Sequence, residues 1–311
     1  MKKVRFDHIV LCVVAFALAA CSSSNGGSED IPDVPTTPEE TKLPINISTT
    51  IGNLDVDTRA TDYAFEQGDK IGLYVVNHAA DGTSQPLQPT GNHVDNMLLT
   101  YNGMWIPRQP IYWQDKTTNA DFYLYSPYRA TIDDVKAMPF SVAADQSREA
   151  DYKAGDLLIG SAKNIAPTEE AVSVATKHVM SQMLVKLVPG NGFTEQSLAS
   201  ADVKIQINGL KTEATVNIAE AKATVAGTAK TITPLKQNDE YRAVVVPQTV
   251  AEGNLITVTV DGRDFNLKKG FTFVAGTRHK FTVTLYKVSN GVNVTIDKWE
   301  NDDIDHGGIA E

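Results

Sequence analysis

Short runs in which apolar and polar residues alternate recur along most of this 311-residue sequence. In the first of them, Ile45, Ile47, Thr49 and Ile51 alternate with polar residues. The run 255–260 has the same period and is followed at once by an Asp-Gly pair. A period of two is typical of a half-buried β-strand, and Asp-Gly is a strong hairpin signal. The pattern therefore predicts antiparallel β-sheet.

Other short β-like runs are bounded by turn residues such as Asn102-Gly103 and Ser126-Pro127. They are predicted as strands at 70–76, 96–101, 120–125, 156–160, 183–188, 203–207, 214–218, 241–246, 263–267, 280–286 and 292–299. Only two brief helices are expected, near 146–152 and 194–200. Many short strands with frequent turns predict an all-β protein made of two consecutive antiparallel β-sandwich domains. We expect these domains to span residues 44–170 and 171–311, with a linker at 166–170.

The first twenty residues are expected to be an export signal. Three basic residues precede the apolar stretch 9–17, and Leu18-Ala19-Ala20-Cys21 follows it. This tetrapeptide resembles the bacterial lipobox, so residues 1–20 are predicted to be a lipoprotein signal peptide and Cys21 the lipid-bearing N-terminus. Acyl chains such as palmitate on Cys21 would anchor the chain in the outer membrane. An ordinary secretory signal with a coincidental cysteine is the alternative.

Composition bounds what the exported chain contains. Cys12, the other cysteine of the sequence, would be lost with the signal peptide. No disulfide is therefore expected, and stability must come from packing. Residues 21–43 are rich in Ser, Gly, Pro and acids and predict a flexible tether. The net charge is −10, which argues against nucleic acid as a partner.

Motifs for catalysis and cofactor binding are missing from the sequence. The six histidines form no HExxH motif and no i, i+4 pair. The sequence also has no Gly-x-Ser-x-Gly elbow, Walker loop or dinucleotide-binding turn. We therefore expect no enzyme, no catalytic residue, no metal site and no cofactor, although a sandwich could still bring remote carboxylates together. Asp302, Asp303 and Asp305 fit a solvated acidic tail better than a calcium site.

Aromatic residues gather in the predicted first domain. They could stack on sugar rings or fill the core, and strand alternation favours the core. The series consists of Trp105, Tyr112, Trp113, Phe122, Tyr123, Tyr125 and Tyr128. His178 stands among apolar neighbours and is expected to be a hydrogen-bonded structural histidine.

Several stretches together resemble the fimbrillin family, including its Mfa-like branch. These proteins are subunits of type V pili on Gram-negative anaerobes of the Bacteroidetes group. Besides the lipobox, the matching stretches are TRA at 58–60, FEQGDKIGLY at 65–74, IYW at 111–113, DFYLYSPY at 121–128, KHVMSQM at 177–183, YRAVVVPQ at 241–248 and VTIDKW at 294–299. The resemblance implies two transthyretin-like β-sandwich domains, in agreement with the periodicity.

The resemblance also implies a route of maturation and assembly. An Arg-specific protease would cut between Arg59 and Ala60, in the polar gap after the first strand. The cut would remove residues 21–59 with the lipid and the strand 45–51. A strand from another fimbrial subunit would then replace the lost one, which builds a filament for adhesion at the cell surface.

The segment that donates a strand is less clear in this sequence. Val292, Val294 and Ile296 alternate well, whereas the tail 300–311 is acidic and poor in apolar residues. Either the run 292–299 donates, or the chain sits at the tip or base of the fimbrium. The alternative function is a surface lipoprotein that does not polymerise and binds host glycan or protein through Trp105 and Trp113.

Overall fold

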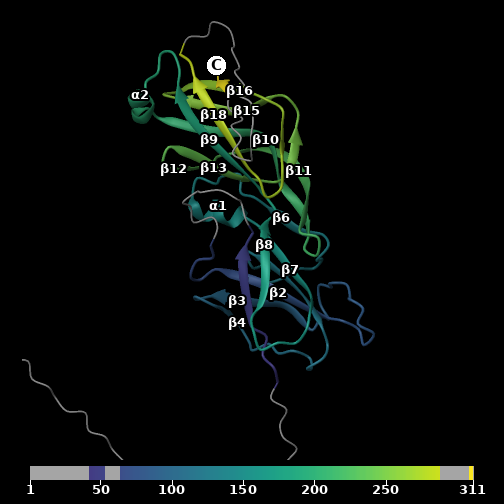
Figure 1. The fold of residues 1–311 in the computed structure, drawn as a ribbon. Helices are drawn as coiled ribbons and strands as arrows, with labels where there is room; N and C mark the ends of the chain where they lie inside the picture. Colours follow the sequence, from purple (N-terminus) through teal and green to yellow (C-terminus); the bar gives the residue numbers. More distant parts are fainter. Residues whose placement is uncertain (1–41, 53–63, 288–307, 311) are drawn as a thin grey trace, which may run out of the picture. The chain divides into compact units, whose positions relative to one another are not determined.

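A computed structural model describes residues 42–52, 64–287 and 308–310 of the chain. These residues form β-strands and two short helices, α1 (Glu149–Gly155) and α2 (Glu195–Ser200) (Figure 1). Helix α2 begins with a capping box, in which the Thr194 and Ser197 side chains each accept a hydrogen bond from the other residue's backbone N–H. The prediction of an all-β fold is confirmed. None of the helices in these described residues is long and apolar enough to cross a membrane.

The first sheet has seven strands in the order β1-β8-β7-β5-β2-β3-β4. Their bounds are β1 Ile47–Ile51, β2 Lys70–Asn77, β3 Val94–Tyr101, β4 Trp105–Pro107, β5 Ala120–Ser126, β7 Leu158–Ile165 and β8 Val172–His178. Strands β2 and β5 are buried on both faces because alternate side chains enter two different hydrophobic clusters. Leu73 and Phe122 belong to the first cluster, which lies on one face, whereas Tyr74 and Tyr123 belong to a second, larger cluster on the other.

The remaining described strands form two five-stranded sheets and one strand pair. One sheet has the order β11-β10-β15-β16 with β6 also paired to β10, the other has the order β12-β13-β9-β18-β19, and β14 pairs with β17. The bounds are β6 Met138–Ser141, β9 Ser181–Pro189, β10 Val203–Asn217, β11 Lys222–Ile232, β12 Leu235–Gln237, β13 Glu240–Val245, β14 Gln248–Val250, β15 Asn254–Val260, β16 Arg263–Lys268, β17 Phe271–Phe273, β18 Arg278–Leu285 and β19 Gly308–Ala310. The inward side chains of β9, β10, β13, β15 and β18 share the second cluster, as expected of packed sheets.

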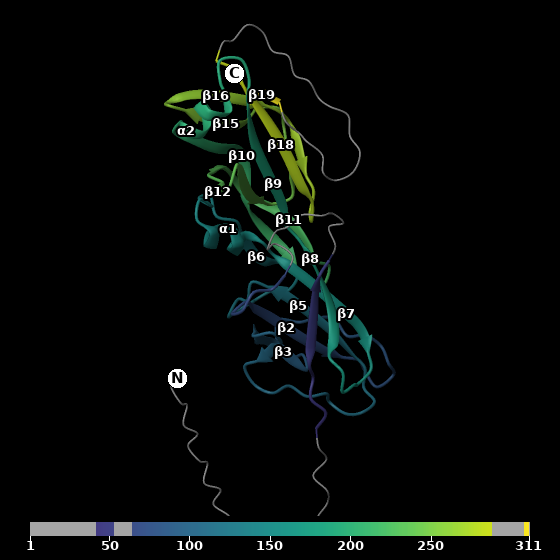
Figure 2. The ribbon, with the colours of Figure 1, turned by 60° about the vertical axis from the view of Figure 1, so that its left-hand side comes forward.

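The predicted antiparallel pairing holds for most strands but not for all. Strand β1 pairs in parallel with β8, and β18 pairs in parallel with β9 on one side and with β19 on the other (Figure 2). Paired strands that are far apart in sequence are not joined by a tight turn, so the direction of pairing is free to be parallel. The exclusively antiparallel arrangement expected from hairpin signals is therefore wrong for these pairs.

The sheets interleave along the chain around residue 170. Strand β6 precedes that position but pairs with β10, whereas β8 follows it and pairs with β7 and β1. Strands before and after the predicted linker therefore share sheets. The division into domains 44–170 and 171–311 stays a prediction.

Gly72, in the family-like stretch 65–74, has a packing role that requires glycine. It lies opposite Tyr125 on the neighbouring strand, and a Cβ atom at Gly72 would come within 2.2 Å of the Tyr125 ring. The ring is fully buried and its hydroxyl group donates to Asn96 Oδ1 at 2.7 Å. Because Gly72 has no side chain, the Tyr125 ring can pack directly against its backbone.

We expect Gly72→Ala to lower the free energy of unfolding by about 1–3 kcal/mol, because the buried ring must move to accept a methyl group. Urea denaturation followed by circular dichroism measures the change. Gly253→Ala is the matched control, since its added Cβ would meet nothing nearer than the Ala251 oxygen at 3.9 Å. Equal losses in the two variants would contradict the assigned role of Gly72.

Candidate functional site

The first strand, expected from the sequence to be removable, lies at one end of the seven-stranded sheet. Its register with β8 runs from Ile47 opposite Val172 to Ile51 opposite Thr176. Asn46 O accepts from Val172 N at 2.8 Å, and Thr50 O accepts from the Thr176 hydroxyl at 3.1 Å. Backbone pairing therefore holds one side of this strand along its whole length.

The residues just before β1 are also held from the other side. Ile45 N donates to Ile111 O at 2.9 Å, and Trp113 N donates to Leu43 O at 2.9 Å. Pro44 and Tyr112 form the antiparallel bridge between these two contacts. Segment 43–51 thus begins between two backbone segments and continues as an edge strand, and we call the residues around it the β1 site: Trp105 together with residues 111–113 and 172–176.

Side chains of segment 43–51 divide between core and solvent. Ile45 and Ile47 are 4% and 6% exposed and belong to the first hydrophobic cluster, together with Trp105 and Trp113. Asn46, Ser48 and Thr50 are exposed on the other face. Burial of an isoleucine side chain contributes about 1.5–3 kcal/mol, so these two residues are a substantial part of what holds the strand in its site.

Thr49 makes the polar contact of the buried face. Its Oγ1 accepts a hydrogen bond from Trp105 Nε1 at 2.8 Å. Trp105 belongs to β4, at the opposite end of the sheet from β1, so this bond joins the two ends of the sheet. The bonds of Ile111 and Trp113 tie the start of the same segment to the stretch of chain that follows β4. The first hydrophobic cluster is enclosed where the two ends of the sheet meet.

Phe65, which follows residues 53–63, packs against the same indole. The Phe65 ring contacts the Trp105 ring edge-on, with ring centres 4.9 Å apart. The centre of the Tyr101 ring lies 5.0 Å from that of Trp105. Ile51 and Phe65 also line a cavity of about 420 Å³, which Lys153 of α1 borders. The two stretches of chain that flank residues 53–63 are therefore both anchored near Trp105.

Several predicted site residues lie outside the described part of the chain. They are Cys21, Arg59, Ala60, Val292, Val294 and Ile296. Of the acidic tail, residues 308–310 form β19 and pair with residues 283–285 of β18. The tail, expected to be a poor donor strand for another subunit, thus contributes a short strand to a sheet of its own chain.

The structure decides between the two interpretations of the aromatic series for most of its members. Trp105, Trp113, Phe122, Tyr123 and Tyr125 are all buried, at 6% exposure or less. Tyr112 is 38% exposed and Tyr128 is half-buried. The proposal that Trp105 and Trp113 stack on glycans is therefore wrong for this state of the molecule, because their rings face the hydrophobic cluster.

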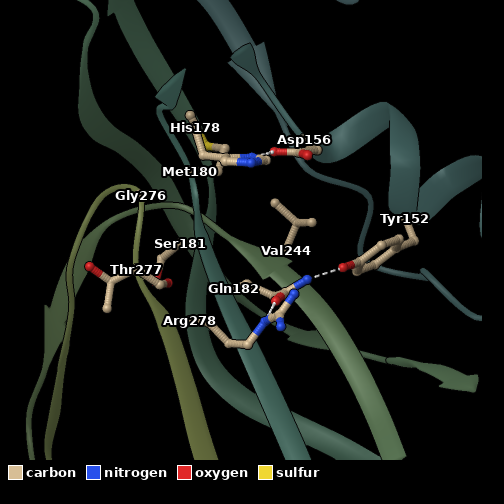
Figure 3. A pocket seen from close by; sticks show the side chains of 10 residues that line it. All are labelled: Tyr152, Asp156, His178, Met180, Ser181, Gln182, Val244, Gly276, Thr277 and Arg278. Atoms are coloured by element: carbon tan, nitrogen blue, oxygen red, sulfur yellow. Dashed lines mark hydrogen bonds and ion pairs between the residues drawn. The ribbon is translucent and has the colours of Figure 1, made fainter. Parts of the chain in front are cut away.

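His178 and Asp156 line a small cavity between β8, β9 and the loop after α1 (Figure 3). His178 Nδ1 lies 2.7 Å from Asp156 Oδ1, and Gln182 bonds to both Tyr152 and Arg278. The cavity volume is about 30 Å³, which is the size of one water molecule rather than a substrate. His178 is thus hydrogen-bonded as the sequence predicts. Within residues 42–52 and 64–287, no cluster of three or more His, Cys, Asp and Glu is placed to bind a metal ion.

A buried carboxylate that sequence reasoning missed lies at the start of β5. Asp121 is 2% exposed and accepts hydrogen bonds from His78 Nε2 at 2.9 Å, Ser84 Oγ at 2.7 Å and Asn164 N at 2.8 Å. Lys163 Nζ lies 3.3 Å away. Burial by itself would raise the pKa of Asp121, but these hydrogen bonds and the Lys163 charge outweigh it and lower the pKa to about 2.

This lowered pKa predicts a loss of stability in acid. The folded pKa lies below the unfolded value, so the stabilisation is present above about pH 4 and disappears as pH falls towards 2. We expect Asp121→Asn to lower the free energy of unfolding by about 2 kcal/mol at pH 7 and to flatten its dependence on pH between 4 and 2. Urea titrations at several pH values test this. Asp239→Asn, in an exposed turn, is the control, and an unchanged pH slope in Asp121→Asn would contradict the assignment.

Comparison of the sequence with known proteins assigns the chain to a family. The fimbrillin-like family profile matches residues 58–299. The chain belongs to the fimbrillin-like family. A Bacteroides uniformis protein, provisionally named fimbrium subunit Fim1C, is 30% identical over 299 residues, which cover 91% of this chain and 93% of the relative. The resemblance read from the sequence motifs is confirmed.

Other relatives of this fimbrillin-like chain agree with the assignment. A Bacteroides ovatus protein, provisionally named fimbrium tip subunit Fim1C, is 26% identical over 60% of this chain, and the match spans 36% of that longer protein. Two crystal structures of provisionally assigned cell adhesion proteins share the fold. The B. uniformis structure has a TM-score of 0.62 at 24% identity and covers 80% of this chain and 94% of its own, and the B. ovatus structure has 0.64 at 17% identity, covering 78% and 92%.

Proposed function

We propose that this fimbrillin-like chain is a structural subunit of a fimbrium, exported as a lipoprotein through Cys21 and matured by cleavage after Arg59. Removal of the strand 45–51 would open the β1 site, and a strand of another subunit would fill it. Family membership and the relative named as a fimbrium subunit support a structural role in a surface filament rather than a catalytic one.

The observation that carries this proposal is the way segment 43–51 is held. It supplies two buried isoleucines to a cluster made of residues far along the chain, yet it connects to the rest only through residues 53–63. A cut in that connection would leave the strand bound by non-covalent contacts alone. Its loss would expose apolar side chains and the backbone groups of β8, and such an open sheet edge favours pairing with another strand.

Incubation of the purified exported chain with an Arg-specific protease tests the proposal. We expect loss of residues 21–59 followed by ladders of oligomers on a gel run without boiling. Mass spectrometry of the product locates the cut. A chain that resists cutting at Arg59, or a cut chain that stays monomeric at high concentration, would instead favour the surface lipoprotein that does not polymerise.

A further inference from the structure

The hydrogen bond between Trp105 and Thr49 imposes a requirement on any strand at the β1 site. The Trp105 side chain is almost fully buried, and its ring neighbours Phe65 and Tyr101 offer aromatic contacts. Thr49 Oγ1 is the acceptor that the described residues give to the indole N–H, at 2.8 Å. An indole N–H can only donate, so a strand without an acceptor at this position would leave it unsatisfied. A buried unsatisfied donor weakens binding by about tenfold or more.

The remaining contacts of the buried face are apolar. Ile45 and Ile47 fill the first hydrophobic cluster four and two residues before Thr49. The intervening side chains face solvent and place no demand on the occupant. Together with the parallel register on β8, these contacts define a pattern of five residues: apolar, any, apolar, any, hydroxyl.

We propose that Trp105 is a specificity-determining residue of the β1 site, which selects strands with Ser or Thr two residues after a pair of alternating apolar residues. This inference rests on the proposed function, in which another strand replaces β1. The partner that fits is a strand of pattern Ile/Val-x-Ile/Val-x-Ser/Thr running in the direction of β1.

The candidate donor segment of this chain does not carry that pattern in this direction. When Val292 and Val294 are placed at the positions of Ile45 and Ile47, Ile296 falls at the position of Thr49. Isoleucine has no acceptor for the indole N–H. The run 292–299 of a second copy of this chain is therefore a weaker occupant of the β1 site than a strand of another fimbrial subunit that has the hydroxyl residue.

Peptide competition on the full exported chain tests this selection. Cys21→Ser removes the lipid, and a recognition sequence for a site-specific protease replaces residues 57–62, so that one cut leaves the strand held by non-covalent contacts alone and a peptide can displace it. The probe is a fluorescent peptide with the sequence of residues 44–52, PINISTTIG. We expect the same peptide with Thr49→Val to bind about tenfold more weakly, whereas Ser48→Ala, on the solvent face, should bind like the original peptide.

Two further measurements isolate the indole. Trp105→Phe in the protein keeps an aromatic ring but removes the N–H, and it should abolish the difference in affinity between the original peptide and its Thr49→Val variant. A peptide of residues 292–299 should bind more weakly than the 44–52 peptide and should gain about tenfold from Ile296→Thr.

Two outcomes would overturn the selection by Trp105. One is equal binding of the original peptide and its Thr49→Val variant to the unmodified site, and the other is equal binding of the 292–299 and 44–52 peptides. Failure of the 44–52 peptide to bind at all would instead count against strand replacement itself.

Discussion

Ile47→Asp is expected to release β1 from its site without any proteolysis. Ile47 is 6% exposed within the first hydrophobic cluster, where an aspartate would lose the burial of the isoleucine and gain an unpaired carboxylate. Loss of an isoleucine contact alone costs about 2–5 kcal/mol, and an uncompensated charge adds to it. Because β1 is an edge strand, the chain can avoid the full cost by letting this strand leave.

Hydrogen exchange at β8 measures this release. Val172 N donates to Asn46 O, so its exchange should rise by more than roughly 100-fold in Ile47→Asp. Sedimentation of the uncut variant should show oligomers that grow with concentration. Ser48→Asp is the matched control, because the neighbouring side chain is exposed and a charge there should change little. Exchange at Val172 that stays at the wild-type rate in Ile47→Asp would show that the strand remains paired with β8, and would contradict the predicted release.

The alternation in 45–51 was enough to predict this strand and its buried face. The structure confirms that Ile45 and Ile47 point to the core while Asn46 and Ser48 face solvent. The partner was not predictable in the same way. Strand β8 is not among the strands predicted from the sequence, and its pairing with β1 connects residues more than 100 positions apart. Local periodicity defines which face of a strand is buried, but not its neighbour or its direction.

The polar contacts of the candidate site lay beyond the sequence for a related reason. Trp105 was expected to be a core residue or a sugar platform, and neither interpretation anticipates a hydrogen bond to Thr49, 56 positions earlier. The sequence contains a weak indication of the role of Asp121, because an acidic residue near the start of an otherwise apolar strand requires an explanation. The partners that lower its pKa come from two separate segments, the loop after β2 and strand β7, which only the folded sheet brings together.

Similar reasoning applies to the two predicted helices. Both exist, but α1 begins at Glu149 rather than near Gln146. Gln146 is instead fully buried, and its side chain exchanges two hydrogen bonds with the backbone of Val244. A buried amide that mimics a strand neighbour in this way has no local sequence signature, so the boundary shifted by one turn.

Arg59→Ala should abolish maturation, and with it assembly of the proposed filament. An Arg-specific protease requires an arginine before the cut bond, so removal of this side chain should slow release of residues 21–59 by more than roughly 100-fold. Arg148→Ala is the matched control, because the Arg148 side chain is 80% exposed but stands at the start of α1 within ordered structure. Proteases need an extended, locally unfolded substrate, so this second arginine should not support efficient cutting.

The decisive comparison combines cleavage with strand release. In the wild-type chain, cutting at Arg59 leaves segment 43–51 bound by its backbone contacts with β8 and 111–113 and by two buried isoleucines, so release should follow cutting with a measurable delay. Addition of Ile47→Asp to Arg59→Ala should restore oligomers in a chain that the protease cannot process, because vacating the β1 site, rather than the cut itself, permits assembly. Oligomers absent from the double variant but present in cut wild-type protein would mean that the new chain end created at Ala60 is itself needed.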